Sequence, residues 1–311
     1  MGPRFDGIPI GFLRKNRDRS RKPNPKRIGA SDMAAIMGIS PWSSPWEPWA
    51  RIVKGFEKPV SEAMLWGVML EPLLLDYFEH ITNLSVERGD TIDHPTRPWQ
   101  RYTLDGRMRD TNAGTAVVEI KTTSVWLADR WGLSGSADIP EDCMCQVQMY
   151  MEAENATIAY VGCLIGGQEF RIFKVPANKP MQGRLIEAAE RFWRDHVLTG
   201  LPPPTDGHKA CGRTLERMHS GPARDPFARE ATEAEEALAM ELMRAKNDME
   251  SAEKRFDLIK HTFEQNIGDD TAIEGPFGKI TWQRRRVKNH KTGETEIKRA
   301  FVPKFKGEVD G

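Results

Sequence analysis

The clearest pattern of apolar and polar positions is a strand, a turn and a second strand in the middle of the chain. Residues 101–109 and 115–121 are rich in β-branched and apolar side chains, as strands are. Between them, residues 110–114 read Asp-Thr-Asn-Ala-Gly. Asn and Gly tolerate left-handed backbone conformations, and Asp can bond to its own backbone. The pattern therefore predicts a hairpin that turns near Asn112.

Apolar residues three and four positions apart predict helices around this hairpin, and short apolar runs predict more strands. The expected helices are residues 33–37, 61–82, 142–154 and 181–198, and the further strands are residues 84–93, 156–165 and 168–175. Ser31 or Asp32 is expected to cap the first helix, which should end at Gly38.

Three tryptophans follow that first helix among several prolines, namely Trp42, Trp46 and Trp49. Core packing is the ordinary interpretation of such a cluster. Stacking on nucleic-acid bases is the alternative.

The last part of the chain has a different pattern. Residues 234–267 carry apolar side chains at alternating steps of four and three, which predicts one long amphipathic helix. The positions are Leu238, Leu242, Ala245, Met249, Ala252, Phe256, Ile259 and Phe263. This face could pack on another protomer, or the segment could close on itself as a helical hairpin. A short basic β-hairpin is expected after it, with Arg284, Arg285, Arg286 and Lys288 as its cations.

These patterns divide the chain into four parts. We expect a basic, flexible tail over residues 1–26 and one folded domain over residues 27–205. A polar linker over residues 206–230 would then lead to a helical appendage with a basic hairpin, residues 231–311.

Charge changes the picture only through its distribution, because the formal net charge is zero. The first 30 residues and residues 279–306 are strongly basic. Such blocks are usually solvated tails. Beside a site for phosphate chemistry, they favour nucleic acid as a partner.

The four cysteines contain no CxxC pair, so they do not form a disulfide framework and indicate a reducing cytoplasm. His208 and Cys211 are only one pair of zinc-type ligands, too few for a site. The sequence shows no signal peptide and no membrane-length apolar run. We therefore expect a soluble cytoplasmic protein with no membrane partner.

The hairpin carries the candidate chemistry. If it turns near Asn112, Asp105 and Glu119 face each other across the strand pair, about 5 Å apart at Cβ. Alternation along the strand puts Lys121 on the same face as Glu119 and turns Ile120 toward the core. Two carboxylates and a lysine on one sheet face suit metal-dependent phosphodiester hydrolysis.

Each element alone is common. An ExK tripeptide is usually a solvated strand face, and Asp105 could simply begin a turn with Gly106. The two neighbouring helices add Glu71, which could equally be a surface residue, and Gln146 with Tyr150 one turn apart on one face. The ordered set of these elements is what indicates an active site. Lys121 would orient or deprotonate the attacking water, and Gln146 could hold the lysine, the water or a phosphate oxygen.

This ordered set resembles the YqaJ-like viral recombinase family, which includes phage lambda exonuclease, within the PD-(D/E)XK nuclease superfamily. The resemblance covers roughly residues 27–200. Its motifs are IGASDMAAIMGISPW, WGVMLEP, TLDG, VVEIKT and QVQMYM. It implies an α/β fold with a central mixed sheet flanked by helices, here extended by the long helix or helical hairpin and the short β-hairpin.

The resemblance also implies an activity, which is Mg²⁺-dependent 5′-to-3′ digestion of double-stranded DNA ends that feeds a single-strand annealing protein. Mn²⁺ is expected to substitute for Mg²⁺. The family further implies a homo-oligomer, such as a trimeric ring, in the cytoplasm of a bacterial host of a phage or prophage. An endonuclease on the same site, or a DNA-binding recombination partner with a weak site, are the alternatives.

The resemblance assigns a role to each candidate residue. Asp105, Glu119 and the Ile120 carbonyl would hold the metal. Lys121 would be the catalytic lysine, Gln146 the motif glutamine and Glu71 the helix carboxylate. Ser31, Arg27, Thr103 and Tyr150 are the candidates for contacts with DNA or its 5′-phosphate. The cysteines do not match the arrangement of the superfamily's iron–sulfur nucleases, so no cluster is expected.

Overall fold

The computed structural model describes residues 26–56, 59–110, 114–221, 229–288 and 295–306. The chain forms two compact units, Met1–Pro222 and Ala223–Gly311. Within the described residues, no helix combines the length and the apolar character needed to cross a bilayer.

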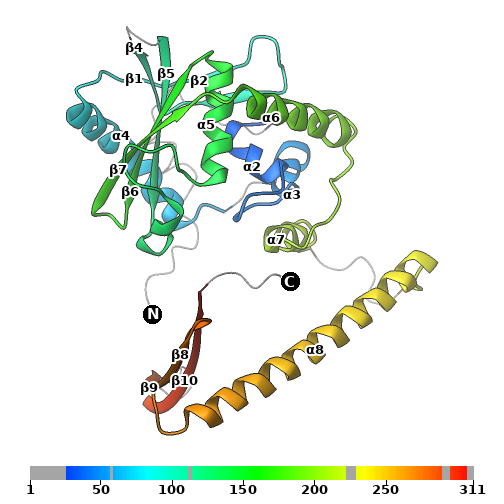
Figure 1. Cartoon of the computed structure of the whole chain (residues 1–311). Coiled ribbons are helices and arrows are strands. Elements are labelled where there is room, and N and C mark those ends of the chain that lie inside the picture. Colours follow the sequence, from blue (N-terminus) through cyan, green and yellow to red (C-terminus); the bar gives the residue numbers. More distant parts are fainter. Residues whose placement is uncertain (1–25, 57–58, 111–113, 222–228, 289–294, 307–311) are drawn as a thin grey trace. The chain divides into compact units, whose positions relative to one another are not determined.

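The first unit is built on a five-stranded sheet in the order β1-β4-β5-β6-β7 (Figure 1). Its strands are β1 (Glu87–Arg88), β4 (Gly106–Asp110), β5 (Gly114–Thr123), β6 (Ile158–Ile165) and β7 (Glu169–Pro176). β5 and β6 run parallel, and the other neighbours are antiparallel. The expected mixed sheet is confirmed. The hairpin β4–β5 is also confirmed, although its tip lies outside the described residues.

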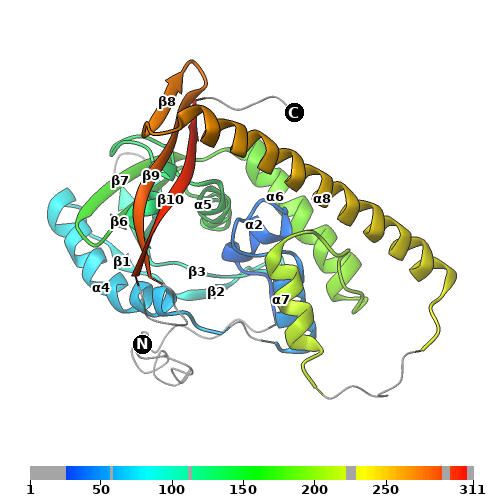
Figure 2. The same cartoon turned by 90° about the horizontal axis from the view of Figure 1, so that it is seen from below.

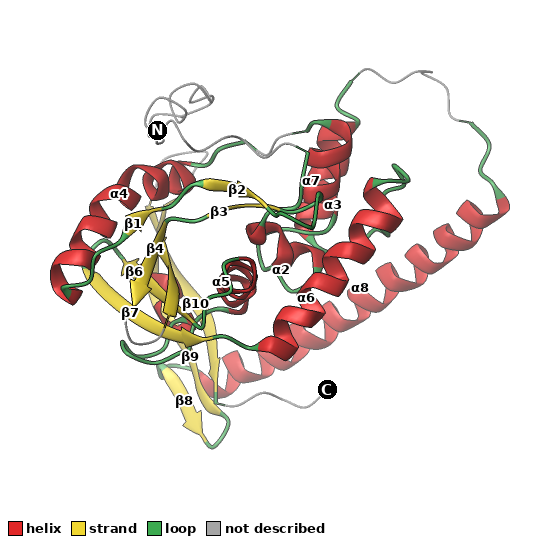
Figure 3. Cartoon of the chain, turned by 90° about the horizontal axis from the view of Figure 1, so that it is seen from above, coloured by secondary structure: helices red, strands yellow, loops and turns green. Residues whose placement is uncertain are grey.

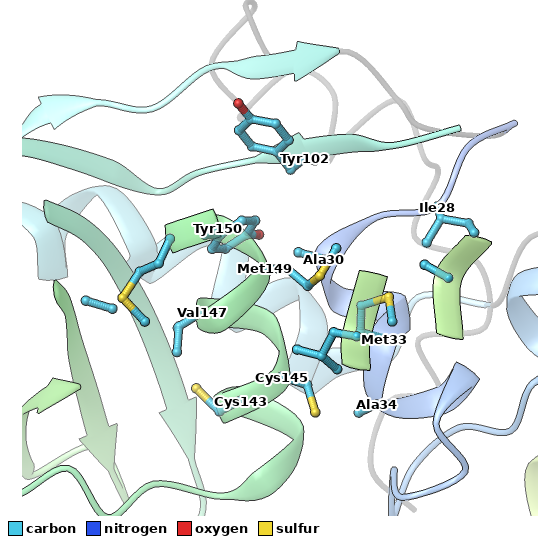
Figure 4. Close-up of a cluster of buried hydrophobic side chains, with 14 of the residues drawn as sticks. Ile28, Ala30, Met33, Ala34, Tyr102, Cys143, Cys145, Val147, Met149 and Tyr150 are labelled. Atoms are coloured by element: carbon cyan, nitrogen blue, oxygen red, sulfur yellow. The ribbon is translucent and has the colours of Figure 1, made fainter. Parts of the chain in front are cut away.

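Helices cover both faces of this sheet, so alternate residues of β5 enter two different clusters. Val118 and Ile120 pack against α4 (Glu62–Thr82) through its Leu75 and Phe78. Val117 faces the larger cluster around α5 (Glu141–Ala153), with α2 and α6 beyond it (Figure 3). Figure 4 shows how α5 meets the first folded segment through Met149, Ala30 and Met33. Ile120 thus lies in the apolar cluster on the α4 side of the sheet, facing the core as expected, and Glu119 and Lys121 lie on the α5 side.

Two of the expected strands are each split in two. Residues 101–109 divide into β3 (Arg101–Thr103) and β4, and residues 84–93 divide into β1 and β2 (Thr91–Asp93). β2 pairs with β3 in a separate two-stranded sheet. Both segments leave the main sheet where Gly89 crosses Leu104, and a Cβ at Gly89 would stand 2.3 Å from the Leu104 carbonyl oxygen. The residue pattern of these two segments gave no sign of this crossing.

Asp32 occupies the N-cap position of the first helix, as expected, but the expected side-chain cap does not form. A 3₁₀ turn, η1 (Ala30–Asp32), precedes α2 (Met33–Ile36), and neither Ser31 nor Asp32 caps α2 with its side chain. Asp32 Oδ2 instead accepts a bond from the Gly29 amide at 2.7 Å and pairs with Arg51 at 2.5 Å. The helix does end before Gly38, whose φ is +72°. Ser61 caps α4 by accepting from the Met64 amide.

Two of the three tryptophans are core residues. Trp46 and Trp49 belong to α3 (Trp46–Trp49), which continues into a π-helical turn, η2 (Ala50–Lys54). Both are buried, and their rings meet edge-on at 5.3 Å. Trp42 is half exposed and remains available for another role.

The expected linker contains a helix that belongs to the first unit. After α6 (Lys179–Phe192) and η4 (Trp193–Val197), α7 spans Lys209–Met218 and buries Ala210, Cys211 and Thr214. The folded domain therefore extends past residue 205. His208 accepts from the Ala210 amide at 3.0 Å and caps α7, while Cys211 lies in the apolar core. Neither residue has the surroundings of a zinc ligand.

The described residues of the second unit form one helix and a three-stranded sheet (Figure 2). α8 (Glu233–Ile267) is uninterrupted over 35 residues and begins with a capping box between Thr232 and Glu235. The sheet has the order β10-β9-β8, from β8 (Ala272–Gly275), β9 (Gly278–Lys288) and β10 (Thr295–Phe305). The helical hairpin does not occur, and the basic β-hairpin is longer than expected, with 11 residues in each strand.

Candidate active site

The hairpin brings Asp105 and Glu119 together as the sequence predicted. β4 pairs with β5 so that Gly106 stands opposite Val118, which places Asp105 beside Glu119 at the edge of the ladder. Asp105 Oδ2 accepts a bond from the Ile120 amide at 2.8 Å. The two carboxylates are 8% and 3% exposed, so the pair of negative charges is buried.

Lys121 and Gln146 complete a compact polar cluster with Glu119. The Lys121 ammonium donates to Glu119 Oε1 at 2.5 Å and to Gln146 Oε1 at 2.9 Å. Gln146 Nε2 also donates to Glu119 Oε1, at 2.7 Å. Gln146 therefore orients both charged partners at once, and its own amide orientation follows from this network.

Tyr150 anchors this cluster from one turn further along α5. Its hydroxyl accepts from Gln146 Nε2 at 3.0 Å and donates to the Thr103 carbonyl at 2.7 Å. The Thr103 side chain is engaged elsewhere, with Thr91 at 2.9 Å. Both candidate DNA contacts thus hold the site together, and Tyr150 is 4% exposed.

Burial and neighbouring charge shift the pKa of both central groups. Burial, then the charge of Asp105, raises the pKa of Glu119 to about 8, although Lys121 pulls it down. Burial disfavours the Lys121 ammonium, but Glu119, Cys143 and Asp105 outweigh this effect and raise its pKa. Lys121 is therefore the cation that compensates the carboxylate pair.

The residues present fit a divalent cation. Glu119 Oε2 is a buried carboxylate oxygen with no hydrogen-bond partner, which is costly unless a cation compensates it. Within the described residues no three His, Cys, Asp or Glu side chains form a metal-binding group. The protein donors here are thus Asp105 and Glu119, with the Ile120 carbonyl as the backbone candidate. Such a small donor set suits Mg²⁺, which keeps several water ligands.

Glu71 is close enough for its charge to affect the ionisation of Glu119. It lies half buried on α4, and its charge contributes to the raised pKa of Glu119. It is not grouped with Asp105 and Glu119 as a third metal donor.

A cavity of about 800 Å³ opens onto this cluster. Lys121 and Gln146 lie on its wall, and Ser31, Trp42 and Trp66 line it farther out. Trp66 and Trp42 are each about half exposed, at 51% and 50%. The cavity thus offers an open, partly aromatic approach to a lysine and a glutamine that cover the buried carboxylates.

The candidates for the 5′-phosphate contact do not line one common hollow. Ser31 is exposed and lines the cavity, as well as a second hollow with Arg51 and Arg217. Arg27 lines neither hollow and forms an ion pair with Asp93 at 2.6 Å. The basic candidates Arg284, Arg285 and Arg286 are exposed on β9 in the second unit, and Lys288 is the last residue of that strand.

Two residues near the site were missed by the sequence reasoning. Arg130, from η3 (Val125–Arg130), lines the cavity, pairs with Asp142 at 3.0 Å and lies over the Trp42 ring. Cys143 lies close enough to Lys121 to affect its pKa. No spacing in the sequence connects either residue to the hairpin, so only the fold reveals them.

The class of protein follows from this fold and site together with comparisons to known proteins. Residues 19–157 match the YqaJ-like viral recombinase domain. The uncharacterized protein YqaJ of Bacillus subtilis (strain 168) is 30% identical over 218 residues, which are 67% of this chain and 66% of that protein. About a third of each chain is thus unmatched. This part of the chain belongs to the YqaJ-like viral recombinase family.

Solved structures resemble the chain more distantly. The alkaline exonuclease LHK-Exo from Laribacter hongkongensis is 16% identical, with a TM-score of 0.46 over 62% of this chain and 94% of that one. A putative exonuclease from Eubacterium rectale is 13% identical, with a TM-score of 0.41 over 66% and 92% of the two chains.

Proposed function

We propose that this chain is a divalent-metal-dependent DNA nuclease that hydrolyses phosphodiester bonds. Its active site would be formed by Asp105, Glu119 and Lys121. The observation that carries the proposal is Glu119. One of its oxygens is bonded to Lys121 and Gln146, and the other is buried without a partner beside Asp105. The YqaJ-like family and the exonucleases among the similar structures support it.

Each residue has a task in this proposal. Asp105 and Glu119, with the Ile120 carbonyl, would hold Mg²⁺ or Mn²⁺. The ion would lower the pKa of an attacking water and neutralise charge on the phosphate. Lys121 would contact the scissile phosphate and position the water, because its ammonium faces the cavity and is fixed by Gln146. Glu71 would add negative charge, and no iron–sulfur cluster is involved.

The substrate that fits best is a double-stranded DNA end, digested from 5′ to 3′ for single-strand annealing by a partner protein in a bacterial cytoplasm. Ser31 lies on the cavity wall, where it would meet the DNA terminus. Arg27 is paired with Asp93 and would have to leave that partner to join it. A homo-oligomer would keep the enzyme on its substrate.

End-labelled linear duplexes with a 5′-phosphate or a 5′-hydroxyl, incubated with Mg²⁺ or with EDTA, test this function. We expect Mg²⁺-dependent release of nucleotides from linear duplex, faster from the 5′-phosphate. Covalently closed circular DNA should be spared. Cleavage of the closed circle would identify an endonuclease. Binding of DNA without cleavage in the presence of Mg²⁺ would indicate a recombination partner with a weak site.

A further inference from the structure

The second unit displays an apolar stripe along the whole of α8. Its members repeat every three and four residues, and the most exposed are Leu238 (65%), Leu242 (71%) and Met249 (73%). Phe256 and Ile259 continue it at 56% and 48%. So many exposed apolar side chains on one line are typical of a helix that pairs with another helix. We propose that this partner is α8 of a second copy, running antiparallel about a two-fold axis between Glu250 and Ser251.

The sizes of the side chains favour this orientation. In an antiparallel pair, residues equally far from the axis share a layer. Phe256 then faces the partner's Ala245, Met249 faces the partner's Ala252, and Leu242 faces the partner's Ile259. Most layers thus combine a large and a small or branched side chain, which fills space evenly. In a parallel pair, Phe256 would meet itself and each alanine would meet an alanine, so that overfilled and hollow layers alternate.

The charges beside the stripe favour the same orientation. In the antiparallel pair, Lys246 lies next to the partner's Glu253 on one flank, and Asp248 lies next to the partner's Arg255 on the other. The two-fold axis repeats each attractive pair. In a parallel pair, Asp248 would lie next to the partner's Glu253, and Arg255 next to the partner's Lys260, which are two repulsive contacts. Glu241 next to the partner's Lys246 would be the one attractive contact of this kind. Flanking charges of this kind set the orientation of paired helices.

The shape and length of α8 agree with the pairing. A shallow hollow on the helix is lined by Ala252, Arg255, Phe256 and Ile259, with Ser251 at its edge. In this register, the partner's Ala245 would enter it. The axis lies at the middle of Glu233–Ile267, so the two helices would overlap fully, over about 50 Å. This interface is independent of the proposed nuclease function.

Charge reversal in the full-length protein tests the orientation, read as the dimer dissociation constant by sedimentation. Arg255→Glu places a new carboxylate beside the partner's Asp248 twice, and we expect about a tenfold weaker dimer. Asp248→Arg should weaken it similarly, and the double variant Asp248→Arg with Arg255→Glu should restore it. A parallel pair predicts the reverse, because each single variant would remove a repulsion. A monomer at all concentrations, or an assembly that none of these variants affects, overturns the proposal.

Cross-linking supplies a second readout. The native cysteines are all buried, so a cysteine added to α8 is the reactive one. Mixing a Leu242→Cys chain with an Ile259→Cys chain should give a mixed disulfide on mild oxidation, because these positions share a layer. Each variant alone should cross-link poorly, since its two copies stand about 25 Å apart. Efficient cross-linking of either variant with itself would indicate a parallel pair and contradict the proposal.

Discussion

Lys121 has one role in the folded structure and a second role in the proposed chemistry of the site. Its ammonium is bonded to Glu119 and Gln146, and it compensates two buried carboxylates. It also lines the cavity, and it is bonded directly to one of these carboxylates, that of Glu119. Removing the Lys121 side chain should therefore affect cleavage more than folding, because this side chain is 29% exposed and water can replace part of its contact with Glu119.

We expect Lys121→Ala to lower DNA cleavage at least about 100-fold, the usual effect of losing a group that positions or transfers a proton. The variant should still fold, as circular dichroism would show. Lys179→Ala, an exposed lysine at the start of α6, is the matched control and should cleave like the unchanged protein. Equal activity of both variants would place the chemistry elsewhere.

The raised pKa of Glu119 makes stability depend on pH. A carboxyl whose pKa rises from 4.5 to about 8 on folding holds its proton more tightly in the folded state. The metal-free protein should thus lose stability as pH rises from about 4.5 to about 8 and level off above that. Glu119→Gln should show a flatter profile in this interval.

Thermal melting with and without Mg²⁺ measures this effect. Mg²⁺ should stabilise the unchanged protein more at pH 8.5 than at pH 6, since a carboxylate must lose its proton to bind a metal. Glu119→Gln should gain little from Mg²⁺ at either pH. A Mg²⁺ shift that is the same in both proteins would exclude Glu119 as a ligand.

At this scale the sequence predicted the centre of the site and missed its supports. Counting outward from the turn was enough to pair Asp105 with Glu119, because antiparallel register is fixed by the turn. The bonds from the Ile120 amide to Asp105 and from Tyr150 to the Thr103 carbonyl depend on how distant segments cross. Arg27 was assigned to the DNA terminus from its position near Ser31, and its ion pair with Asp93, which is distant in the sequence, could not be foreseen.

Among the elements, the long helices and the strands β5 and β6 were predictable, and the irregular junctions were not. α4 and α5 have clear apolar periodicity and appear within a residue or two of the expected bounds. The split near Leu104 follows from a close backbone crossing at Gly89, which has no local signal. α7 is short and polar, and it buries only small side chains such as Ala210 and Cys211, so it resembled a linker.

α7 gives a prediction about where the first unit ends. A chain cut after residue 222 should fold and melt like the first unit of the full protein. A chain cut after residue 205 should melt about 10 °C lower, because it loses burial worth on the order of 3 kcal/mol around Cys211 and Thr214. Equal melting temperatures for the two chains would show that α7 does not support the core.

At the scale of the whole molecule, the candidate catalytic residues and the arginine run of β9 belong to different units. The carboxylates and Lys121 belong to the first unit, and Arg284, Arg285 and Arg286 lie exposed on β9 of the second. Alternation along the strand sends Arg285 to one face of the hairpin and the other two to the opposite face. We therefore expect the second unit to add affinity for DNA through these arginines.

Replacing Arg284, Arg285 and Arg286 by alanine should weaken DNA binding at low salt and flatten its salt dependence. Each lost phosphate contact should reduce the slope of log affinity against log salt by about one. Three exposed arginines of the first unit, Arg184, Arg191 and Arg194, serve as the control set. Fluorescence anisotropy at several salt concentrations measures both effects, and equal slopes for the two sets would assign β9 no role in DNA binding.

Arg299 determines how the second unit should respond to heat. Its guanidinium donates to the carbonyls of Gly268 and Asp270 at the end of α8, and lies 4.3 Å from the centre of the Trp282 ring. Arg299 thus helps to fasten the helix to the sheet, together with the contact between Phe263 and Phe277, at a helix end whose exposed carbonyls carry partial negative charge. The helix and the hairpin should consequently unfold cooperatively in one transition, and Arg299→Ala should separate it into two.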